Sequence, residues 1–511
     1  MKHEKLHLRP DGLYVEEPSG RRRLSGRAEV IAFGQYENSD NFVAIIRFDV
    51  GDTSAYIICP LSDLRKPGIL SDLLVNKGFD LPLDRHDRQL VLNYLAASNP
   101  PQRWVILRRT GWWRNTYVLA DRAYGPEADQ VCHEAAFCGR GIGIGSSGTS
   151  SAMKILGSAA HLGSAGSLDD WKTVVAVPLS GSSRTILAIS SALTAYLMHP
   201  LGLENGGYHI PGDSSAGKTS MALFGRSVSG RAVRSELTTW KTTEAGSEII
   251  AMENCDLLLI LDEIAQLDPD PVRAGKRARD IVFHLCSGNP KSRGNGYNQQ
   301  LPGPTWRAFI FSTGVAPLSD LATAAGLSRD DGDNVRLIDV PLAGDRTSIF
   351  DLTPLNSADG EALCRELEHA VGTRCYGTAG PALIERFVEK RDEHLQLLEG
   401  WMADFVAQAG VPETRNGGWE RRFVRRFAAC YAVGRLATKL DILPWSEDLV
   451  RKAVVTCYRD ARQAMPNADT ILKDGLEQLR IGLEEASILD ARSGLEGIKS
   501  REIAEADGFR R

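Results

Sequence analysis

A single glycine-rich stretch constrains the fold of this chain more than any other feature. Residues 212–219 read Gly-Asp-Ser-Ser-Ala-Gly-Lys-Thr, which fits the pattern G-x-x-x-x-G-K-[ST]. A short apolar run precedes this stretch, and a helix-compatible run, Thr219 to Phe224, follows it. Strand, loop and helix in this order let backbone amides and a helix N-terminus cradle phosphate groups. The alternative is a glycine-rich turn in which Lys-Thr occurs by chance.

The stretch predicts a set of phosphate contacts. Lys218 would reach the β- and γ-phosphates of ATP, and the hydroxyl of Thr219 would serve as a ligand of Mg²⁺. The residues expected to bind the nucleotide are Gly212, Asp213, Ser214, Ser215, Ala216, Gly217, Lys218, Thr219 and Ser220.

A second motif, Leu257 to Leu261 followed by Asp262 and Glu263, supports the first. Five apolar residues are typical of a strand buried on both faces in a parallel sheet, and ligands bind at the carboxyl ends of such strands. Asp262 would hold Mg²⁺ through water, and Glu263 would polarise the attacking water. The alternative is a core strand that ends in solvated acids. Together the motifs predict an ATP- or GTP-hydrolysing protein.

Composition limits the class of protein further. A chain of 511 residues, 43% hydrophobic and 24% charged, is typical of a globular protein with two to four domains. The formal net charge of −5 means that any nucleic-acid surface is local. We see no membrane-spanning run and no secretory signal, and the nine cysteines form no C-x-x-C pair. We therefore expect a cytoplasmic protein with reduced thiols and no membrane partner.

The pattern along the chain predicts four parts. Residues 1–170 are rich in β-type runs, with a hairpin across Gly51-Asp52 and a helix near residues 83–97. Residues 171–345 hold the two nucleotide motifs, residues 346–475 are strongly helical, and residues 476–511 form a tail long enough for part of a winged helix. The Trp112-Trp113 pair could stack on nucleic-acid bases, or it could pack in the core or in a domain contact.

Two further positions are candidates for catalysis. The apolar run Trp306 to Phe311 predicts a strand that leads into Ser312 and Thr313. A polar side chain there, beside the strand of Asp262, would bond to the γ-phosphate or the lytic water, and both residues are candidates. Arg336 precedes another apolar strand. It would reach the nucleotide of a neighbouring subunit, or it would pair with Asp333 or Asp339.

Several separated motifs occur in an order that resembles the bacterial and phage family called domain of unknown function 927. The resemblance covers roughly residues 10 to 465. The motifs are Gly111-Trp112, Leu168–Trp171, Leu201–His209 leading into the glycine-rich stretch, Trp240–Thr243, Gly288 with Lys291 and Arg293, Arg425–Ala428 and Leu443–Trp445. That family includes AAA+ ATPases similar to the mini-chromosome-maintenance helicases of mobile elements.

The resemblance implies a fold and further roles. The fold would be α/β, with an AAA+ P-loop core on a parallel sheet, an N-terminal β-rich α+β domain and a C-terminal helical lid domain. Lys291 and Arg293 would lie on a pore-facing hairpin that grips DNA phosphates. Arg336 would be the arginine finger, and Arg422 or Arg426 a second sensor in trans. The hairpin tip reads Gly-Asn-Pro-Lys where the family often has Gly-Gln-Gly-Lys.

These expectations converge on an ATP-dependent DNA helicase or translocase of mobile-element type. It would use ATP and Mg²⁺, assemble as a ring, as a hexamer, and hold single-stranded DNA in its pore. The alternative is an AAA+ ATPase switch or scaffold in anti-phage defence or assembly, without DNA unwinding. A P-loop kinase fits the long helical C-terminal region less well.

Overall fold

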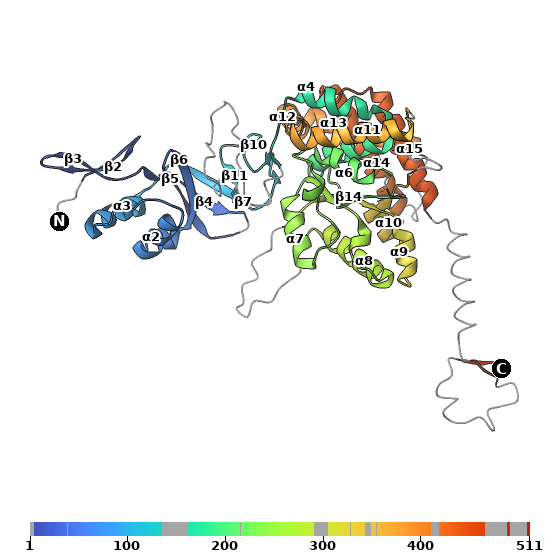
Figure 1. Cartoon of the computed structure of the whole chain (residues 1–511), viewed down its shortest axis with the longest axis horizontal. Helices are drawn as coiled ribbons and strands as arrows, with labels where there is room; N and C mark the ends of the chain where they lie inside the picture. Colours follow the sequence, from blue (N-terminus) through green and yellow to red (C-terminus); the bar gives the residue numbers. More distant parts are fainter. Residues whose placement is uncertain are drawn as a thin grey trace. The chain divides into compact units, whose positions relative to one another are not determined.

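The computed structural model describes residues 5–37, 39–134, 162–214, 216–290, 305–327, 329–342, 349–353, 355–409, 418–465, 488–490 and 508–510. The chain divides into two compact units, Met1–Tyr458 and Arg459–Arg511. In the larger unit an N-terminal α+β part is followed by a parallel sheet with its helices and then by a group of long helices (Figure 1). In the smaller unit, β16 (Ile488–Asp490) pairs in parallel with β17 (Gly508–Arg510).

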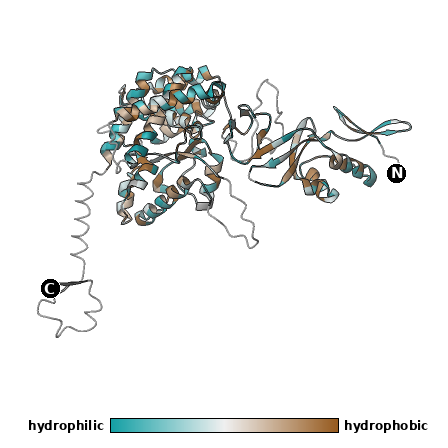
Figure 2. Ribbon diagram, turned by 180° about the vertical axis from the view of Figure 1, so that it is seen from behind, coloured by the Kyte–Doolittle hydropathy of each residue, from teal (hydrophilic) through white to brown (hydrophobic). Residues whose placement is uncertain are grey.

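A five-stranded sheet with the order β11-β7-β4-β5-β6 organises the N-terminal part. Strands β4 to β6 form an antiparallel meander, which confirms the predicted hairpin, and β7 and β11 extend it in parallel. Helices α1 to α3 pack their apolar sides on one face, where brown residues gather in Figure 2. The bounds are β4 Ala28–Tyr36, β5 Phe42–Val50, β6 Thr53–Pro60, α1 Leu61–Leu64, α2 Pro67–Asn76, α3 Arg85–Ala97, β7 Arg103–Leu107 and β11 Val131–His133.

Two three-stranded antiparallel sheets complete this part. One is the N-terminal meander of β1 (Leu6–Arg9), β2 (Gly12–Glu17) and β3 (Gly20–Ser25). The other, in the order β10-β9-β8, consists of β8 (Gly111–Trp113), β9 (Thr116–Val118) and β10 (Ala123–Tyr124). It carries the side chains that attach the N-terminal part to the parallel sheet.

The parallel sheet has the strand order β13-β14-β12-β15, and every pair in it is parallel. Helix α8 packs on one face, where its apolar side meets Leu259 and Ile310. On the other face Tyr208 lies against Phe427 of α14, and α6 approaches Leu258. The strands are β12 Gly206–Pro211, β13 Leu257–Leu261, β14 Ala308–Gly314 and β15 Leu337–Asp339. Helices on both faces explain why β13 is apolar throughout.

Helices of 3 to 17 residues precede and connect these strands. They are α4 Leu168–Trp171, the π-helix η3 Lys172–Ala176, the 3₁₀ helix η4 Pro178–Gly181, α5 Ser183–Tyr196, α6 Lys218–Arg226, the 3₁₀ helices η5 Arg234–Glu236 and η6 Ile264–Gln266, α7 Glu244–Glu253, α8 Pro271–Ser287, α9 Leu318–Ala324 and α10 Asp331–Arg336. Every residue of α5 is buried, because α5 packs against α6, α14 and the sheet.

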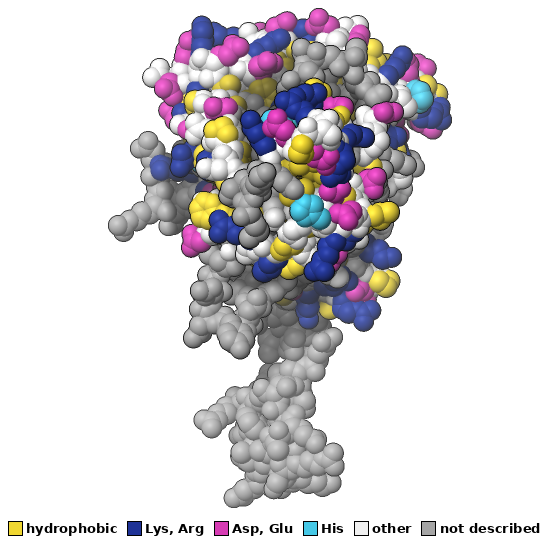
Figure 3. All heavy atoms as spheres, turned by 90° about the vertical axis from the view of Figure 1, so that its left-hand side faces the viewer, with side chains coloured by type: hydrophobic (Ala, Val, Ile, Leu, Met, Phe, Trp, Pro, Cys, Tyr) yellow, Lys and Arg dark blue, Asp and Glu magenta, His cyan; other side chains and the backbone are white. Residues whose placement is uncertain are grey.

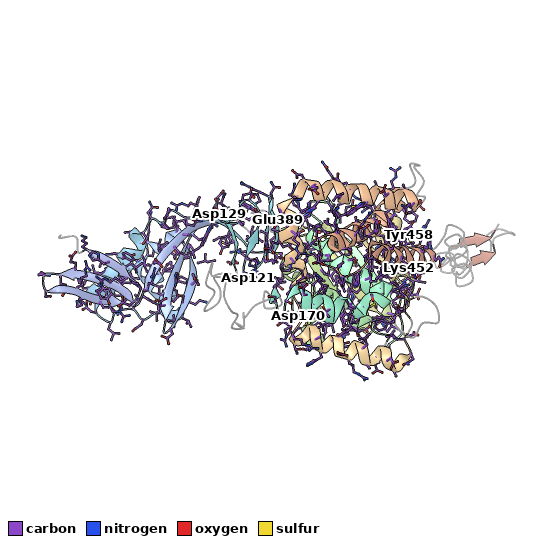
Figure 4. All side chains as sticks on the ribbon, turned by 90° about the horizontal axis from the view of Figure 1, so that it is seen from above. Asp121, Asp129, Asp170, Glu389, Lys452 and Tyr458 are labelled. Atoms are coloured by element: carbon purple, nitrogen blue, oxygen red, sulfur yellow. The ribbon has the colours of Figure 1, made fainter. Side chains whose placement is uncertain are left out.

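The C-terminal region of the larger unit is helical, as predicted. Two of its helices, α12 and α13, are separate because Lys390 between them leaves the helical conformation with φ −135° and ψ 46°. Near the end of this region the ring of Tyr458, labelled in Figure 4, packs edge-on against Phe405 and Phe427. The helices are α11 Ser357–Thr373, α12 Ala379–Glu389, α13 Arg391–Gln408, α14 Gly418–Lys439 and α15 Glu447–Ala464.

The sheets and helices confirm the mixed α/β class predicted from the sequence. Within the part of the chain that the structure describes, no helix is both long enough and apolar enough to span a bilayer.

Candidate functional site

The predicted phosphate loop lies between β12 and α6, at the carboxyl edge of the parallel sheet. Gly217 takes φ +88°, and a Cβ there would lie 2.9 Å from Ile349 Cγ2, so the turn into α6 requires glycine. The first amides of α6 have no acceptor within the helix, and they carry the positive end of its dipole. Ser215 lies outside the described residues, whereas Gly212, Asp213, Ser214 and Ala216 form the described part of the loop.

Lys218 folds back over this loop. Its Nζ donates to the carbonyl oxygens of Gly212 at 2.7 Å and Asp213 at 2.6 Å. The residue is 6% exposed, and burial lowers the pKa of its ammonium group. A buried cation surrounded by backbone groups gains from an anion placed beside it, so the loop fits a phosphate group.

Three oxygen-bearing side chains meet at the end of β13. Thr219 Oγ1 lies 3.2 and 3.3 Å from the two carboxylate oxygens of Asp262. From the other side, the Thr313 hydroxyl donates to Asp262 Oδ1 at 2.6 Å. Among the described residues no group of three His, Cys, Asp or Glu side chains could hold a metal by itself. Thr219 and Asp262 nevertheless fit Mg²⁺, which takes few protein ligands and completes its shell with water and substrate phosphates.

Glu263 is held in a strained conformation beside this cluster. Its φ of +54° lies in the left-handed region that non-glycine residues rarely adopt. The backbone N–H of Glu263 donates to Thr313 Oγ1 at 3.0 Å, and the buried Oε1 atom has no hydrogen-bond partner among the described residues. Strain and an unsatisfied buried carboxylate oxygen are both more common at functional sites than elsewhere.

Ser312 and Thr313 lie on opposite faces of β14. Thr313 faces Asp262, whereas Ser312 bonds to His209 Nδ1 at 2.8 Å and accepts from Trp240 Nε1 at 3.0 Å. Ser312 is fully buried in these contacts. Of the two predicted candidates, the geometry therefore favours Thr313 as the group that contacts substrate, and Ser312 has a structural role.

A cavity of about 660 Å³ adjoins the loop, within the usual size range of small-molecule sites. Its walls combine Lys218, Thr219 and Glu263 with one face of α11, including Gly360, Cys364 and Glu368.

Glu368 joins α11 to the first turn of α6. Its carboxylate accepts from Ser220 Oγ at 2.6 Å and from Arg234 at 2.6 and 2.8 Å. Neither Glu368 nor Arg234 could be recognised from the sequence, because they are 134 residues apart and belong to no local motif. The one available signal was the amphipathic pattern over residues 357–373.

Arg336 lies at the opposite edge of the sheet. It is the last residue of α10, directly before β15, and its guanidinium lies 4.1 Å from the ring centroid of Phe283. The predicted alternative partners are taken: Asp333 pairs with Arg279, and Asp339 pairs with Arg329. Among the described residues no carboxylate lies within ion-pair distance of Arg336.

The two candidates for a second sensor differ in exposure. Arg426 is 6% exposed and donates to the carbonyl oxygens of Glu204, Asn205 and Val335, each at 3.3 Å. The guanidinium of Arg426 is therefore held by backbone carbonyl groups of its own chain. Arg422 has a 44% exposed side chain that pairs with Glu204.

Lys291 and Arg293, the predicted DNA contacts, lie outside the described residues. Trp112 is 2% exposed. Its backbone N–H donates to Asp256 Oδ2 at 2.9 Å, and its indole N–H donates to the carbonyl of Tyr196 at 2.7 Å. Trp112 is therefore a contact between the N-terminal part and the parallel sheet, which was one of the two predicted uses.

The model of the family described as "Domain of unknown function (DUF927)" matches residues 9–300. The chain belongs to the DUF927 family. None of the curated proteins compared with this chain matches it. A solved structure described as "SCCmec type IV Cch - active helicase" is similar, with a TM-score of 0.69 and 15% sequence identity. The similarity covers 98% of this chain and 85% of the other, so the two share a fold along almost the whole of this chain.

Proposed function

We propose that this DUF927 protein is a Mg²⁺-dependent ATPase that acts as a DNA helicase or translocase in the cytoplasm. One arrangement carries the proposal: Lys218, Thr219, Asp262, Glu263 and Thr313 converge at the carboxyl edge of three adjacent parallel strands. Ligands of open α/β sheets bind at this edge. The neighbouring fold described as an active helicase supports the same class of activity.

Each residue has a distinct role in this proposal. The 212–219 loop with Lys218 would bind the triphosphate, and Thr219 and Asp262 would hold Mg²⁺, which neutralises charge on the phosphates. Glu263 would accept a proton from the attacking water, and the lack of a hydrogen-bond partner for its Oε1 among the described residues supports this role. Thr313 would fix Asp262 and orient Glu263 through their shared contacts. Residues 171–345 would then be an AAA+ core, and residues 346–475 its lid.

Arg336 supports assembly into a ring. The register pairs Leu337 of β15 with Gly207 of β12, so Arg336 lies level with Gly206, the first residue of β12. The nucleotide loop begins at the other end of this strand, after Pro211. At about 3.3 Å per residue, the loop of the same chain is roughly 17–20 Å away along the strand, beyond the reach of an arginine side chain. We propose that Arg336 serves the nucleotide of an adjacent chain in a hexameric ring, with Arg422 as the exposed candidate for a second contact.

DNA would bind through a local surface. Figure 3 shows acidic and basic side chains intermixed on the face that it displays, in line with the net charge of −5. We propose that Lys291 and Arg293 supply the phosphate contacts in the pore, because contacts of this kind follow a single strand without regard to its sequence.

The test compares ATP turnover with and without single-stranded DNA in the wild type and in the double variant K291A/R293A. A matched control is R451A/K452A, which removes two exposed cations from α15, where Figure 4 labels Lys452. We expect DNA to stimulate the wild type and the control but not K291A/R293A, and we expect the stimulation to fall steeply with salt.

If DNA does not change the rate of ATP turnover in any of the three proteins, the helicase proposal is wrong, but the proposed ATPase activity is retained. The chain would then fit the second candidate, a nucleotide-driven switch or scaffold. Absence of turnover in the wild type, with and without DNA and Mg²⁺, would remove both.

A further inference from the structure

Two arginines share one aromatic ring at the amino edge of the parallel sheet. Phe283 lies on α8 and is half-buried. The guanidinium of Arg336 lies 4.1 Å from its ring centroid, and that of Arg279, one turn earlier on α8, lies 5.4 Å from it. A ring face attracts a guanidinium without neutralising its charge, so both arginines remain cationic at this surface.

The acid best placed to pair with Arg336 is held by Arg279 instead. Asp333 precedes Arg336 by three residues on α10, a spacing at which acid and base normally interact. Arg279 Nη2 lies 3.2 Å from Asp333 Oδ2, and its Nε donates to Oδ1 at 3.4 Å. Asp333 also accepts from the backbone N–H of Asp330 at 3.2 Å, and its side chain is only 7% exposed.

Arg279 interacts with the second acid at this end of α10 as well. Its Nη2 lies 3.6 Å from Asp330 Oδ2. A Cβ built on Gly332 would lie 2.8 Å from Arg336 Nη1 and 3.0 Å from Asp330 Oδ1, so the side chains of Arg336 and Asp330 both lie beside Gly332. Without Arg279, two carboxylates on the helix of Arg336 would lack their cationic partner.

We infer that Arg279 is a positioning residue for Arg336. By binding Asp333 and Asp330 and by covering part of Phe283, it keeps the Arg336 guanidinium uncompensated and extended along the ring. The anion that Arg336 then binds must come from outside the subunit, and it is the triphosphate held by the 212–219 loop of an adjacent copy. This inference rests on the proposed function, because it assumes that Arg336 acts in trans.

The test measures kcat and KM for ATP in R336A, R279Q, R279K, D333N and R279Q/D333N. R336A should lower kcat by about 10³-fold, the range for an arginine finger. In R279Q the released Asp333 captures Arg336, which must leave this ion pair to reach a phosphate, so kcat should fall roughly two- to fivefold with KM unchanged. R279K keeps one positive charge beside Asp333 and should therefore lose less kcat than R279Q, although a lysine cannot reproduce the separate contacts of Nε and Nη2.

Rescue separates positioning from a structural role. In R279Q/D333N the competing acid is gone, so kcat should return toward the wild-type value. A structural role for the Arg279–Asp333 pair predicts that D333N is as defective as R279Q and that the double variant is no better. Either of these results would overturn the inference. Thermal unfolding of each variant checks that the fold is retained, and R279M replaces R279Q if that variant is unstable.

A mixing experiment tests the proposed function separately. R336A chains and K218A chains are each expected to be inactive alone. Their mixture should regain turnover where an intact loop meets an intact Arg336 across an interface. If R336A by itself keeps the wild-type kcat, then both the proposed action of Arg336 on an adjacent chain and the proposed role of Arg279 are wrong. If mixing restores turnover but D333N fails to rescue R279Q, the role of Arg279 alone is wrong.

Discussion

Thr313 donates its hydroxyl hydrogen to Asp262 across 2.6 Å, while the adjacent Ser312 bonds to His209 and Trp240 on the opposite face of the strand. The same Thr313 oxygen accepts from the backbone N–H of Glu263 at 3.0 Å. The Thr313 hydroxyl therefore contacts both Asp262 and the backbone of Glu263, whereas Ser312 contacts neither residue.

This difference predicts opposite effects for two neighbouring substitutions. T313V keeps the shape of the side chain but removes the hydroxyl, so both acids lose their shared contact. We expect kcat for ATP to fall at least about tenfold, since transition-state groups tolerate little displacement, while the free energy of unfolding changes little. Steady-state kinetics beside thermal unfolding measures both quantities.

S312A is the matched control for T313V. It removes the acceptor of the buried Trp240 N–H and a partner of the His209 ring, which should cost about 1–3 kcal/mol of stability. We expect kcat to stay within twofold of the wild type, roughly the effect of a group outside the site. A loss of turnover in S312A with normal turnover in T313V would reverse our assignment of the two faces.

Glu263 offers the most direct test of the hydrolytic step. E263Q preserves the size of the side chain and removes its capacity to accept a proton. We expect kcat to fall by about 10²–10⁴-fold, the usual contribution of a general base, with nucleotide binding retained. Glu361→Gln is the control, because Glu361 lines the same cavity on α11 and is 67% exposed. Equal losses in both variants would argue against Glu263 as the base.

The nucleotide loop and the buried strand could be predicted because each is a local pattern. The stretch 212–219 specifies its own turn through Gly217, and Leu257 to Leu261 is apolar throughout because both faces of β13 are covered. The same holds for α15, which lies in the stretch predicted to be helical and has an amphipathic pattern along its whole length.

Contacts between distant segments could not be predicted in the same way. Ser220 and Glu368 are 148 residues apart, so their bond depends on how α11 packs on α6. The sequence left Ser312 and Thr313 as equal candidates, because only the pairing of β14 with β13 decides which side faces Asp262. The sequence also left two roles open for Arg336, a contact with a neighbouring subunit or an ion pair with Asp333 or Asp339. Only the structure shows that Asp333 pairs with Arg279 and that Asp339 pairs with Arg329.

The contact of Glu368 with Ser220 and Arg234 predicts a pH-dependent contribution to stability. Burial alone would raise the pKa of Glu368, but the hydrogen bonds from Arg234 and Ser220 hold it below the usual value of 4.5. A carboxyl group whose pKa is lower in the folded state stabilises that state above its unfolded pKa. This stabilisation is lost as the pH falls from about 4.5 through the folded pKa. E368Q should therefore unfold at a lower temperature than the wild type at pH 7, and the difference should shrink below pH 4.5.

The control for that prediction is Glu361→Gln on the same helix. Glu361 pairs with Arg365 at 2.8 Å, but both side chains are about two-thirds exposed, so solvent screens the pair. The unfolding temperature of the Glu361→Gln variant should equal that of the wild type at every pH. A difference between E368Q and the wild type that stays constant from pH 7 to pH 4 would mean that the carboxylate charge is not the cause.

The junction between the N-terminal part and the sheet supplies the last prediction. Asp256 is fully buried directly before β13, where Arg307 Nε donates to its Oδ1 at 2.6 Å and Trp112 N–H to its Oδ2 at 2.9 Å. R307A leaves a buried carboxylate without its cation, which should cost about 3–5 kcal/mol of stability. R122A breaks the exposed pair with Asp121 and should cost at most about 1 kcal/mol. Urea unfolding measures both losses. A cost for R307A as small as that for R122A would mean that the Trp112 contacts, rather than the ion pair, hold the N-terminal part to the sheet.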